Sequence, residues 1–189
     1  ESIAVCSPEG NDCTMAPGGS LEEAVRNAAP GSVIKLGNGV YEAINIRIDN
    51  NLTIRGTDPR LTILQPNALP CIDSPRVVTT TERVFEVIGM QLDVEDLTIR
   101  NGCAVSATGE AAGGGIWASG VVNLRRVIMQ DNAAIVLTPK GPGSAKGGAI
   151  FNGGLMTIED STIITNTAKA NDTGAFGGGL FNNGIATLI

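Results

Sequence analysis

The apolar residues of this chain stand in short runs that alternate with polar residues. Residues 44–48 (INIRI) and 155–158 (LMTI) show the alternation clearly. A period of two places every second side chain on the same face, so the pattern predicts short, half-buried β-strands. In the second half of the chain, no stretch keeps the spacing of an amphipathic helix over roughly ten residues.

A glycine-led motif occurs three times in the second half of the chain and aligns without gaps. The copies are residues 113–117 (GGGIW), 147–151 (GGAIF) and 177–181 (GGGLF). Their aliphatic residues Ile116, Ile150 and Leu180 are 34 and then 30 positions apart, so a constant unit is separated by inserts of variable length. We expect the inserts, residues 135–146 and 169–176, to be loops because they are rich in Gly, Pro, Lys, Thr and Asn.

A repeat of this length indicates a stacked architecture. Each unit offers three short strands in a core of roughly 22 residues, which suits one rung of a β-helix. Helical repeats are excluded because each interior Gly costs a helix about 1 kcal/mol, and a propeller blade needs about 40 residues. The pattern predicts an all-β fold, a single-stranded parallel β-helix of about six or seven rungs over residues 33–189, whose last rung is truncated.

The first residues follow a different pattern. Residues 20–23 (SLEE) form a capping box, in which Ser20 accepts from a backbone N–H and Glu23 reaches back. The amphipathic stretch that follows ends at Pro30 and Gly31 and predicts one short helix. We expect residues 1–32 to form an N-terminal segment whose helix caps the open apolar end and the unpaired strand edges of the first rung.

Composition narrows the possible chemistry. The 189 residues include no His, which excludes a Ser-His-Asp triad, a Cys-His pair and a His-ligated zinc site. The net charge of -6 argues against binding to nucleic-acid phosphates. No apolar run approaches the roughly 18 residues of a membrane span. The chain begins with Glu1, as a chain would whose signal peptide has been removed.

Four cysteines allow three disulfide pairings. Cys6 and Cys13 flank a short polar loop, so we pair them, which leaves Cys71 with Cys103. The alternative is four unpaired, partly buried thiols. Disulfides imply export to an oxidising compartment, and we therefore expect a secreted or cell-surface protein.

Several motifs together resemble a known group of proteins. They are residues 20–25 (SLEEAV), 30–36 (PGSVIKL), 39–41 (GVY), 52–56 (LTIRG) and the glycine-led repeats with their following LTI and STI segments. From Ser20 almost to its end, the chain resembles the right-handed parallel β-helix proteins of the pectate-lyase-like kind, bacterial secreted or surface proteins that include polymorphic outer-membrane-type repeats. The resemblance implies a right-handed coil. It does not specify a function, because the group contains lyases, hydrolases, epimerases, adhesins and proteins without known chemistry.

The catalytic motifs of that group do not carry over to this chain. The Gly-His-Gly element of polygalacturonases needs a His, and nothing matches the calcium-carboxylate and Arg constellation of pectate lyases. Whether the chain is an enzyme stays open. The missing motifs favour a protein without catalysis, and a polysaccharide lyase is the expected class if it is an enzyme.

Stacking turns equivalent repeat positions into columns, and one column is aromatic. Trp117, Phe151 and Phe181 directly follow the aliphatic residue of each copy. Facing outward, they would form a stripe against which sugar rings could lie; facing inward, they would form a ladder in the core. Alternation permits both orientations, and we favour the core because exposed aromatic rings are costly.

A second column is charged. It aligns three pairs, Glu95-Asp96, Arg125-Arg126 and Glu159-Asp160. The favoured interpretation is a ladder of ion pairs between rungs, each contributing about 0.2–1 kcal/mol and opposing register slip. The alternative is a site in which Arg125 and Arg126 and the carboxylates hold a uronate or Ca²⁺.

Two pairs of asparagines, Asn132 with Asn166 and Asn152 with Asn182, occupy equivalent positions and predict structural hydrogen bonds along the stack. No cofactor and no metal site are expected. Calcium is a weak alternative, for which the oxygen ligands would be Asp131, Glu159, Asp160 and Asp172.

The inserts carry most of the remaining lysines. The inserts leave the stack at the same edge, so their lysines Lys140, Lys146 and Lys169 predict a local basic spot that could bind a uronic or sulfated glycan. The alternative is that the two inserts are loops that only increase solubility.

Two functions follow from these patterns. The first is an extracellular adhesion, structural or acidic-glycan-contacting module without catalysis, with a glycan or cell-surface molecule as partner. The second is a fragment of a polysaccharide lyase or glycoside hydrolase acting on acidic polysaccharide. A third, weaker possibility is ice binding through Thr53, Thr98 and Thr162. Because the last rung has no capping sequence, we also expect end-to-end self-association through its open strands.

Overall fold

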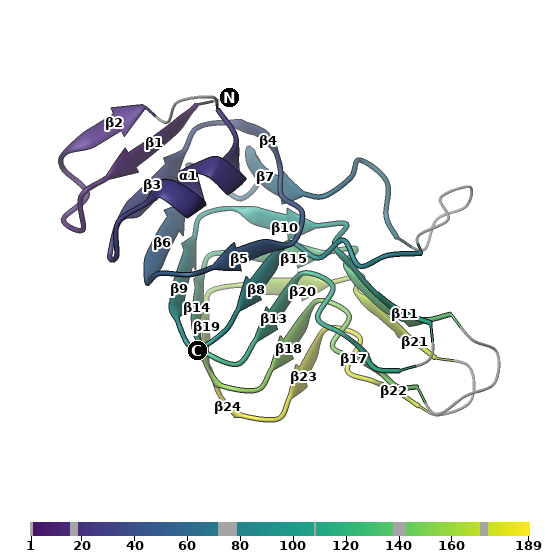
Figure 1. The fold of residues 1–189 in the computed structure, drawn as a ribbon. Coiled ribbons are helices and arrows are strands. Elements are labelled where there is room, and N and C mark those ends of the chain that lie inside the picture. The colour runs from purple at the N-terminus through teal and green to yellow at the C-terminus, as the bar shows by residue number, and fades with distance from the viewer. Residues whose placement is uncertain (1, 16–18, 72–78, 108, 138–142, 171–173) are drawn as a thin grey trace.

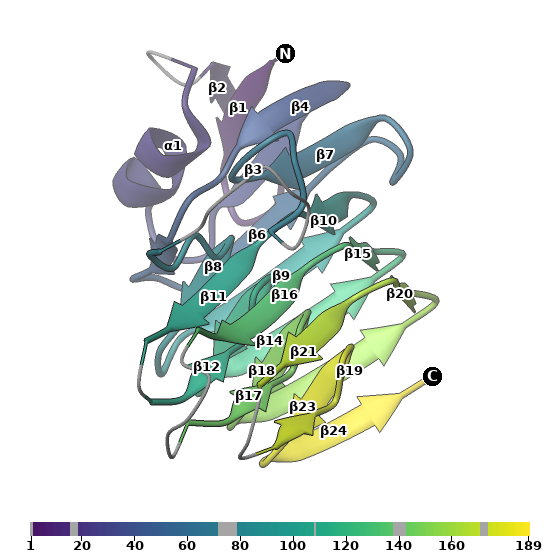
Figure 2. The same cartoon turned by 90° about the vertical axis from the view of Figure 1, so that its right-hand side faces the viewer.

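The chain winds into a parallel β-solenoid. A computed structural model describes residues 2–15, 19–71, 79–107, 109–137, 143–170 and 174–189. Figure 1 looks along the stack, and Figure 2 shows the strands lying above one another from the N-terminal cover to β24. The predicted all-β parallel architecture is confirmed, with a single short helix among the described residues.

The described strands form five sheets. Sheet I has the order β2 (Cys13–Met15), β1 (Ile3–Cys6), β3 (Val33–Leu36), β6 (Leu52–Arg55), β9 (Gln91–Glu95), β14 (Val121–Arg125), β19 (Leu155–Glu159), β24 (Ile185–Leu188). Sheet II has the order β20 (Thr162–Ile164), β15 (Ile128–Gln130), β10 (Thr98–Arg100), β7 (Thr62–Gln65), β4 (Gly39–Glu42). Sheet III has the order β23 (Leu180–Asn182), β18 (Ile150–Asn152), β13 (Ile116–Ala118), β8 (Phe85–Val87), β5 (Ile46–Ile48).

Sheets IV and V are shorter and project from the main stack to one side (Figure 1). Sheet IV contains β11 (Cys103–Ser106), β16 (Ala133–Val136) and β21 (Thr167–Lys169), and sheet V contains β12 (Ala111–Ala112), β17 (Ala145–Lys146) and β22 (Ala175–Phe176). We call these two sheets together the fin. The inserts expected to be loops thus contain strands, because they also pair with their equivalents in the neighbouring turns.

The number of turns is smaller than the sequence pattern indicated. About three turns have full length and contribute to all five sheets; they span residues 91–118, 121–152 and 155–182. Two shorter segments, β3–β5 and β6–β8, precede them, and their described strands belong to sheets I, II and III. The expectation of six or seven rungs is therefore wrong, since each full turn includes the strands of the fin and is longer than the assumed unit.

Equivalent apolar positions lie next to each other in the core, as a parallel stack requires. Ile150 pairs in register with Ile116 on one side and with Leu180 on the other. Ile116 and Ile150 are fully buried. Burying a side chain of this size stabilises the fold by about 1.5–3 kcal/mol, so the repeated aliphatic column is a main source of stability.

The fin has a small core of its own, made of residues with short side chains. Its buried members are Ala104, Ala111, Ala134, Val136 and Ala145. These residues come from both sheet IV and sheet V, so each sheet turns one face toward the other. Because alternate residues of a strand point to opposite faces, the intervening residues lie on the two outer faces of the fin.

Glycines form the corner between sheet V and sheet III. Gly113, Gly147 and Gly177 have φ values of 61°, 60° and 60°, and a Cβ at any of them would collide with a carbonyl oxygen of the same turn. A backbone in this left-handed region favours Gly because it has no Cβ. The glycine-led motif is therefore explained by the corner and needs no ligand.

The N-terminal residues cover the first turn in two ways. The predicted helix is present as α1 (Leu21–Asn27), with Ser20 Oγ accepting from the Glu23 backbone N–H at 3.1 Å. Leu21 and Val25 pack into the main core. The edge of sheet I is covered instead by the β1–β2 hairpin, which pairs antiparallel with β3. The sequence pattern did not predict this hairpin.

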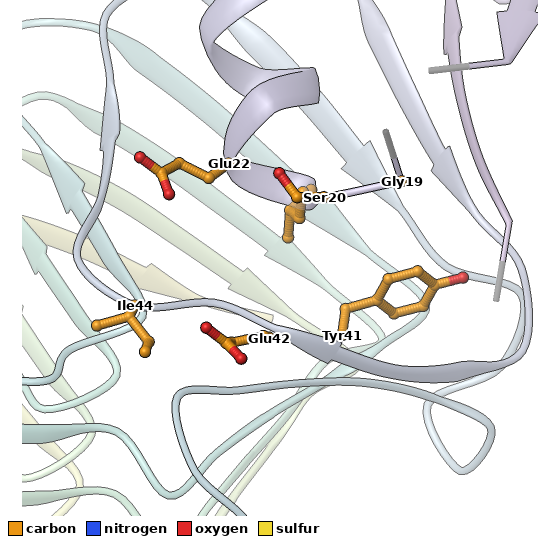
Figure 3. Close-up of a pocket in the computed structure, with 7 residues that line it drawn as sticks. Gly19, Ser20, Glu22, Tyr41, Glu42 and Ile44 are labelled. Atoms are coloured by element: carbon orange, nitrogen blue, oxygen red, sulfur yellow. The ribbon is translucent and has the colours of Figure 1, made fainter. Parts of the chain in front are cut away.

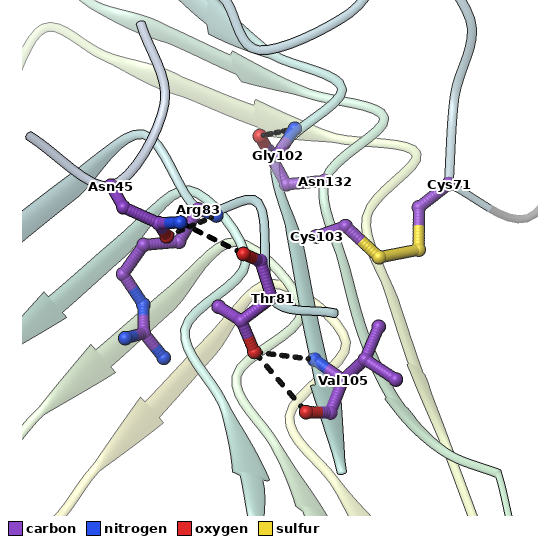
Figure 4. Close-up of a disulfide and its surroundings, with 8 residues drawn as sticks. All are labelled: Asn45, Cys71, Thr81, Arg83, Gly102, Cys103, Val105 and Asn132. Carbon is purple, nitrogen blue, oxygen red and sulfur yellow. Dashed lines mark hydrogen bonds between the residues drawn. A yellow bond between two sulfur atoms is a disulfide. The ribbon is translucent and has the colours of Figure 1, made fainter. Parts of the chain in front are cut away.

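Both predicted disulfides are confirmed. Cys6 and Cys13 are directly paired residues of β1 and β2. Cys71 is bonded to Cys103 at the start of β11, and both are buried (Figure 4). Nearby, Thr81 Oγ1 accepts from the Val105 N–H and donates to the Val105 carbonyl, both at 3.1 Å. The disulfide and this side chain hold Cys71 and Thr81 against β11, the edge strand of sheet IV, where Cys103 also forms an antiparallel bridge with Glu82.

Candidate functional site

The aromatic column lies on the outer face of sheet III. Trp117, Phe151 and Phe181 are the middle residues of β13, β18 and β23, and they pair in register. Adjacent ring centroids are 5.7 Å apart in both contacts, with interplanar angles of 5° and 13°. Ile116 and Ala118 on either side of Trp117 are fully buried, so the rings point outward and are half-buried. The favoured core orientation is therefore wrong; the aliphatic neighbours fill the core instead.

We call Trp117, Phe151 and Phe181 the aromatic row. An offset stack of this kind leaves the ring edges facing solvent, and the edge is the positive part of the aromatic quadrupole. The indole N–H of Trp117 adds a hydrogen-bond donor, with no partner among the described residues. The row thus presents apolar carbon together with weakly positive edges, which suits a partner that has both C–H groups and oxygen acceptors.

The N-terminal end of the row is polar. Glu86 is the residue of β8 paired with Trp117, and Arg47 of β5 comes next in the same column. Arg83 lies beside Glu86, with 3.8 Å between guanidinium and carboxylate, and donates to the carbonyls of Ala112 and Gly113 at 2.8 and 3.1 Å. Burial lowers the pKa of the Arg83 guanidinium from its ordinary value. Arg83 therefore fixes the backbone at Ala112 and Gly113, where the first full turn passes from sheet V to sheet III.

The C-terminal end of the row carries a lysine and a fourth ring. Lys146 of β17 forms an ion pair with Glu110, and its Nζ lies 5.3 Å from the centroid of the Phe181 ring. Phe176 of β22 is the residue paired with Lys146, and its ring lies 6.3 Å from that of Phe181 at a tilt of 59°. The sequence pattern did not point to Phe176, which lies in an insert expected to be a loop, or to Glu110, whose segment shows no repeat.

The predicted basic spot is not assembled among the described residues. Lys146 alternates with Ala145, which faces the fin core, so Lys146 lies on the outer face of sheet V. Lys169 alternates with Ala168, which also faces that core, so it lies on the outer face of sheet IV, on the opposite side of the fin. Lys140 lies outside the described residues.

Arg125 and Arg126 lie on another part of the molecule, at the end of β14 in sheet I. Glu95 accepts ion pairs from Arg55 at 2.6 Å and from Arg125 at 3.2 Å. Arg126 donates two hydrogen bonds to Asp96, at 2.5 and 2.7 Å. The favoured ladder is therefore present between Glu95-Asp96 and Arg125-Arg126, whereas in the described part of the chain Glu159 and Asp160 form no ion pair within 4 Å with these arginines.

The Arg126–Asp96 contact shifts both groups toward their charged forms. Hydrogen bonds from the Arg126 guanidinium lower the pKa of the Asp96 carboxyl from its ordinary value, and the Asp96 carboxylate raises the pKa of Arg126. The two residues stand at the corner after sheet I with φ values of 55° and 53°. Paired in this way, they act as a structural clamp between turns.

The asparagine pairs hydrogen-bond between turns as predicted. Asn132 Nδ2 donates to Asn166 Oδ1 at 3.0 Å, and Asn132 Oδ1 accepts from the Gly102 N–H at 2.9 Å (Figure 4). Asn152 Nδ2 donates to Asn182 Oδ1 at 2.6 Å. These side chains satisfy backbone and amide groups at corners, so their role is structural.

A pocket of about 270 Å³ lies between α1 and β4 (Figure 3), and these elements are at the opposite end of the stack from β24 (Figure 2). Glu22 and Glu42 lie on its wall together with Tyr41. The Tyr41 hydroxyl oxygen lies 3.0 Å from the carbonyl oxygens of both Ser2 and Gly37, which share its one proton, and it accepts from the Ser2 N–H at 3.1 Å, so that it fastens the start of β1 to the first turn. The pocket does not adjoin the aromatic row, and we assign it no ligand.

Within the described ranges, no group of three or more His, Cys, Asp or Glu residues is arranged to hold a metal ion. Of the carboxylates considered for calcium, Asp131 accepts a hydrogen bond from Gln130 at 2.9 Å, and Asp172 lies outside the described residues. The calcium hypothesis remains a prediction.

Comparison of the chain with known protein families, with curated proteins and with solved structures finds no significant match. In the part of the chain that the structure describes, no helix is long and apolar enough to cross a bilayer.

Proposed function

We propose that this chain is an extracellular β-helix module that binds a carbohydrate along the aromatic row and does not cleave it. The observation that carries the proposal is the outward orientation of Trp117, Phe151 and Phe181. They are three of only six aromatic residues in the chain, and they stand in one line on one face.

The physical argument is the cost of exposing rings. Aromatic side chains usually occupy cores, and aligned apolar groups at the surface mark interaction sites. A pyranose ring offers C–H groups for the apolar part of the row and hydroxyl oxygens for the ring edges and for the Trp117 N–H. A linear glycan would therefore repeat its contacts from turn to turn.

An extracellular location is also part of the proposal. The two disulfides and the resemblance to pectate-lyase-like β-helix proteins support a secreted or cell-surface protein. The same resemblance leaves lyase or hydrolase activity as the competing function. That alternative needs arginine and carboxylate groups free to meet a substrate, whereas Arg125 and Arg126 are bonded to Glu95 and Asp96.

The test uses Trp117, which is the only tryptophan of the chain. Its fluorescence is titrated with oligogalacturonate and with neutral cello-oligosaccharide, and Phe151→Ala is expected to weaken binding about tenfold, which corresponds to about 1.4 kcal/mol. Leu155→Ala is the matched control, because Leu155 is an exposed apolar residue on sheet I.

Two results would contradict the proposal. One is that Trp117 fluorescence stays unchanged when the protein is titrated with each glycan of a broad set. The other is the release of unsaturated or reducing sugar ends during incubation, which would make the chain an enzyme.

A further inference from the structure

Lys146 occupies a special position at the C-terminal end of the aromatic row. Its ammonium group contacts the Glu110 carboxylate and lies over the Phe181 ring, 5.3 Å from the centroid, and Phe176 is its partner in the neighbouring strand. Three of these side chains belong to the fin or its edge, and Phe181 belongs to the row. A cation is thus held next to the apolar surface that we propose as the glycan-binding face.

We propose that Lys146 is the subsite for the carboxylate of an acidic sugar, and that Glu110 occupies this subsite in the free protein as a built-in competitor. The proposal rests on the proposed function and makes it more specific. It assigns the aromatic row to a polyuronate, and it assigns the control of affinity to one glutamate.

The contact between Glu110 and Lys146 has the features of a replaceable interaction. Glu110 directly precedes β12, and Lys146 pairs with Ala112 in that strand, so the two charges are diagonal neighbours on one face. Side-chain exposure is 43% for Glu110 and 26% for Lys146. Ion pairs with this exposure contribute little to stability, so an external carboxylate can displace Glu110 without unfolding the fin.

Lys146 keeps donors for a ligand. An ammonium group has three N–H donors, and Glu110 is its one hydrogen-bonding partner among the described residues. The Phe181 face restrains the ammonium by a cation–π contact. The position of the charge is therefore set by the aromatic ring, and it would persist after Glu110 is displaced.

The opposite end of the row carries charges of both signs. Glu86 continues the column beyond Trp117, with Arg83 3.8 Å from it and Arg47 next in the column. Arg83 donates to the carbonyls of Ala112 and Gly113, and Arg47 forms an ion pair with Asp49 at 3.0 Å. Lys146 is the cation that lies over a ring of the row, so we expect the negative group of the sugar to lie at the Phe181 end.

The test compares two probes with the same sugar backbone, oligogalacturonate and its methyl ester, in Trp117 fluorescence titrations. Glu110→Gln removes the competitor, so affinity for oligogalacturonate is expected to rise about three- to tenfold, while affinity for the methyl ester stays unchanged. Lys146→Gln is expected to remove the preference for the acid. In the double variant, the Glu110 substitution has no further effect, because its target charge is gone.

Lys169→Gln is the matched control, since Lys169 lies on the opposite face of the fin, and Glu110→Asp provides a second variant that keeps the charge at a shorter reach. Circular dichroism checks that each variant folds. The inference is overturned if Glu110→Gln leaves oligogalacturonate affinity unchanged, or raises it equally for both probes. It is also overturned if wild type binds both probes equally and Lys146→Gln changes neither. Binding of neither probe would also overturn the inference, whereas the proposed function is refuted only if the neutral cello-oligosaccharide and every other glycan tested fail to bind as well.

Discussion

The aromatic column of sheet III and the charged column of sheet I are built by the same stacking, yet they differ in what they leave unsatisfied. In the charged column, Glu95 contacts Arg55 and Arg125, and Asp96 contacts Arg126. In the aromatic column, each ring stacks on the next, but the edges remain at the surface. Stacking alone therefore does not make a site. The arginines of the charged column are already held by Glu95 and Asp96, whereas the ring edges of the aromatic column are available to a partner.

The largest expected effect lies beneath both columns. Ile150→Ala removes a fully buried side chain between Ile116 and Leu180 and is expected to cost about 2–5 kcal/mol of unfolding free energy. Urea denaturation measures it. A cost below that of Phe151→Ala would show that the outward ring, and not the aliphatic column, carries the packing.

Phe151→Ala comes next in size. It removes two stacked contacts, each worth about 0.5–1.5 kcal/mol, from a half-buried position. The variant is expected to lose more free energy of glycan binding than free energy of unfolding. A fluorescence titration measures the first loss, and thermal unfolding measures the second. Equal losses in both measurements would mean that the row is merely structural.

Glu95→Ala is the matching change in the charged column. It leaves Arg55 and Arg125 without their shared carboxylate, and the expected cost is about 1 kcal/mol because both arginines are partly exposed. Glycan affinity is expected to stay the same. The stability difference from wild type should shrink in 1 M salt, and a salt-independent difference would contradict the electrostatic origin.

The smallest effect is a pH dependence at Asp96. Its lowered pKa means that the contact with Arg126 stabilises the fold above the unfolded-state pKa of about 3.9 and that this stability is lost as pH falls through the folded-state pKa. Arg126→Gln is therefore expected to be less stable than wild type at pH 6, with the difference disappearing toward pH 2. Urea midpoints at both pH values test this, with Lys169→Gln as the control. A difference that persists at pH 2 would assign the effect to packing.

The strands of the fin could not be predicted from the sequence. Residues 135–146 and 169–176 have the composition of loops, yet parts of them form β16, β17 and β22. Strands as short as Ala145–Lys146 and Ala175–Phe176 carry no detectable periodicity. They exist because neighbouring turns bring equivalent backbones into pairing distance, which is a tertiary effect. This pairing placed Phe176, which the sequence pattern had not indicated, beside Lys146.

Sequence alone determined which residues would become neighbours. Constant spacing in the repeat placed Ile150 beside Ile116 and Leu180, and it placed the rings, the charges and the asparagines in columns. Only the tertiary structure decided which face each column occupies and how long a turn is. The physical reason is that a two-residue alternation is symmetric between inside and outside, and the symmetry is broken only when the whole turn closes around one core.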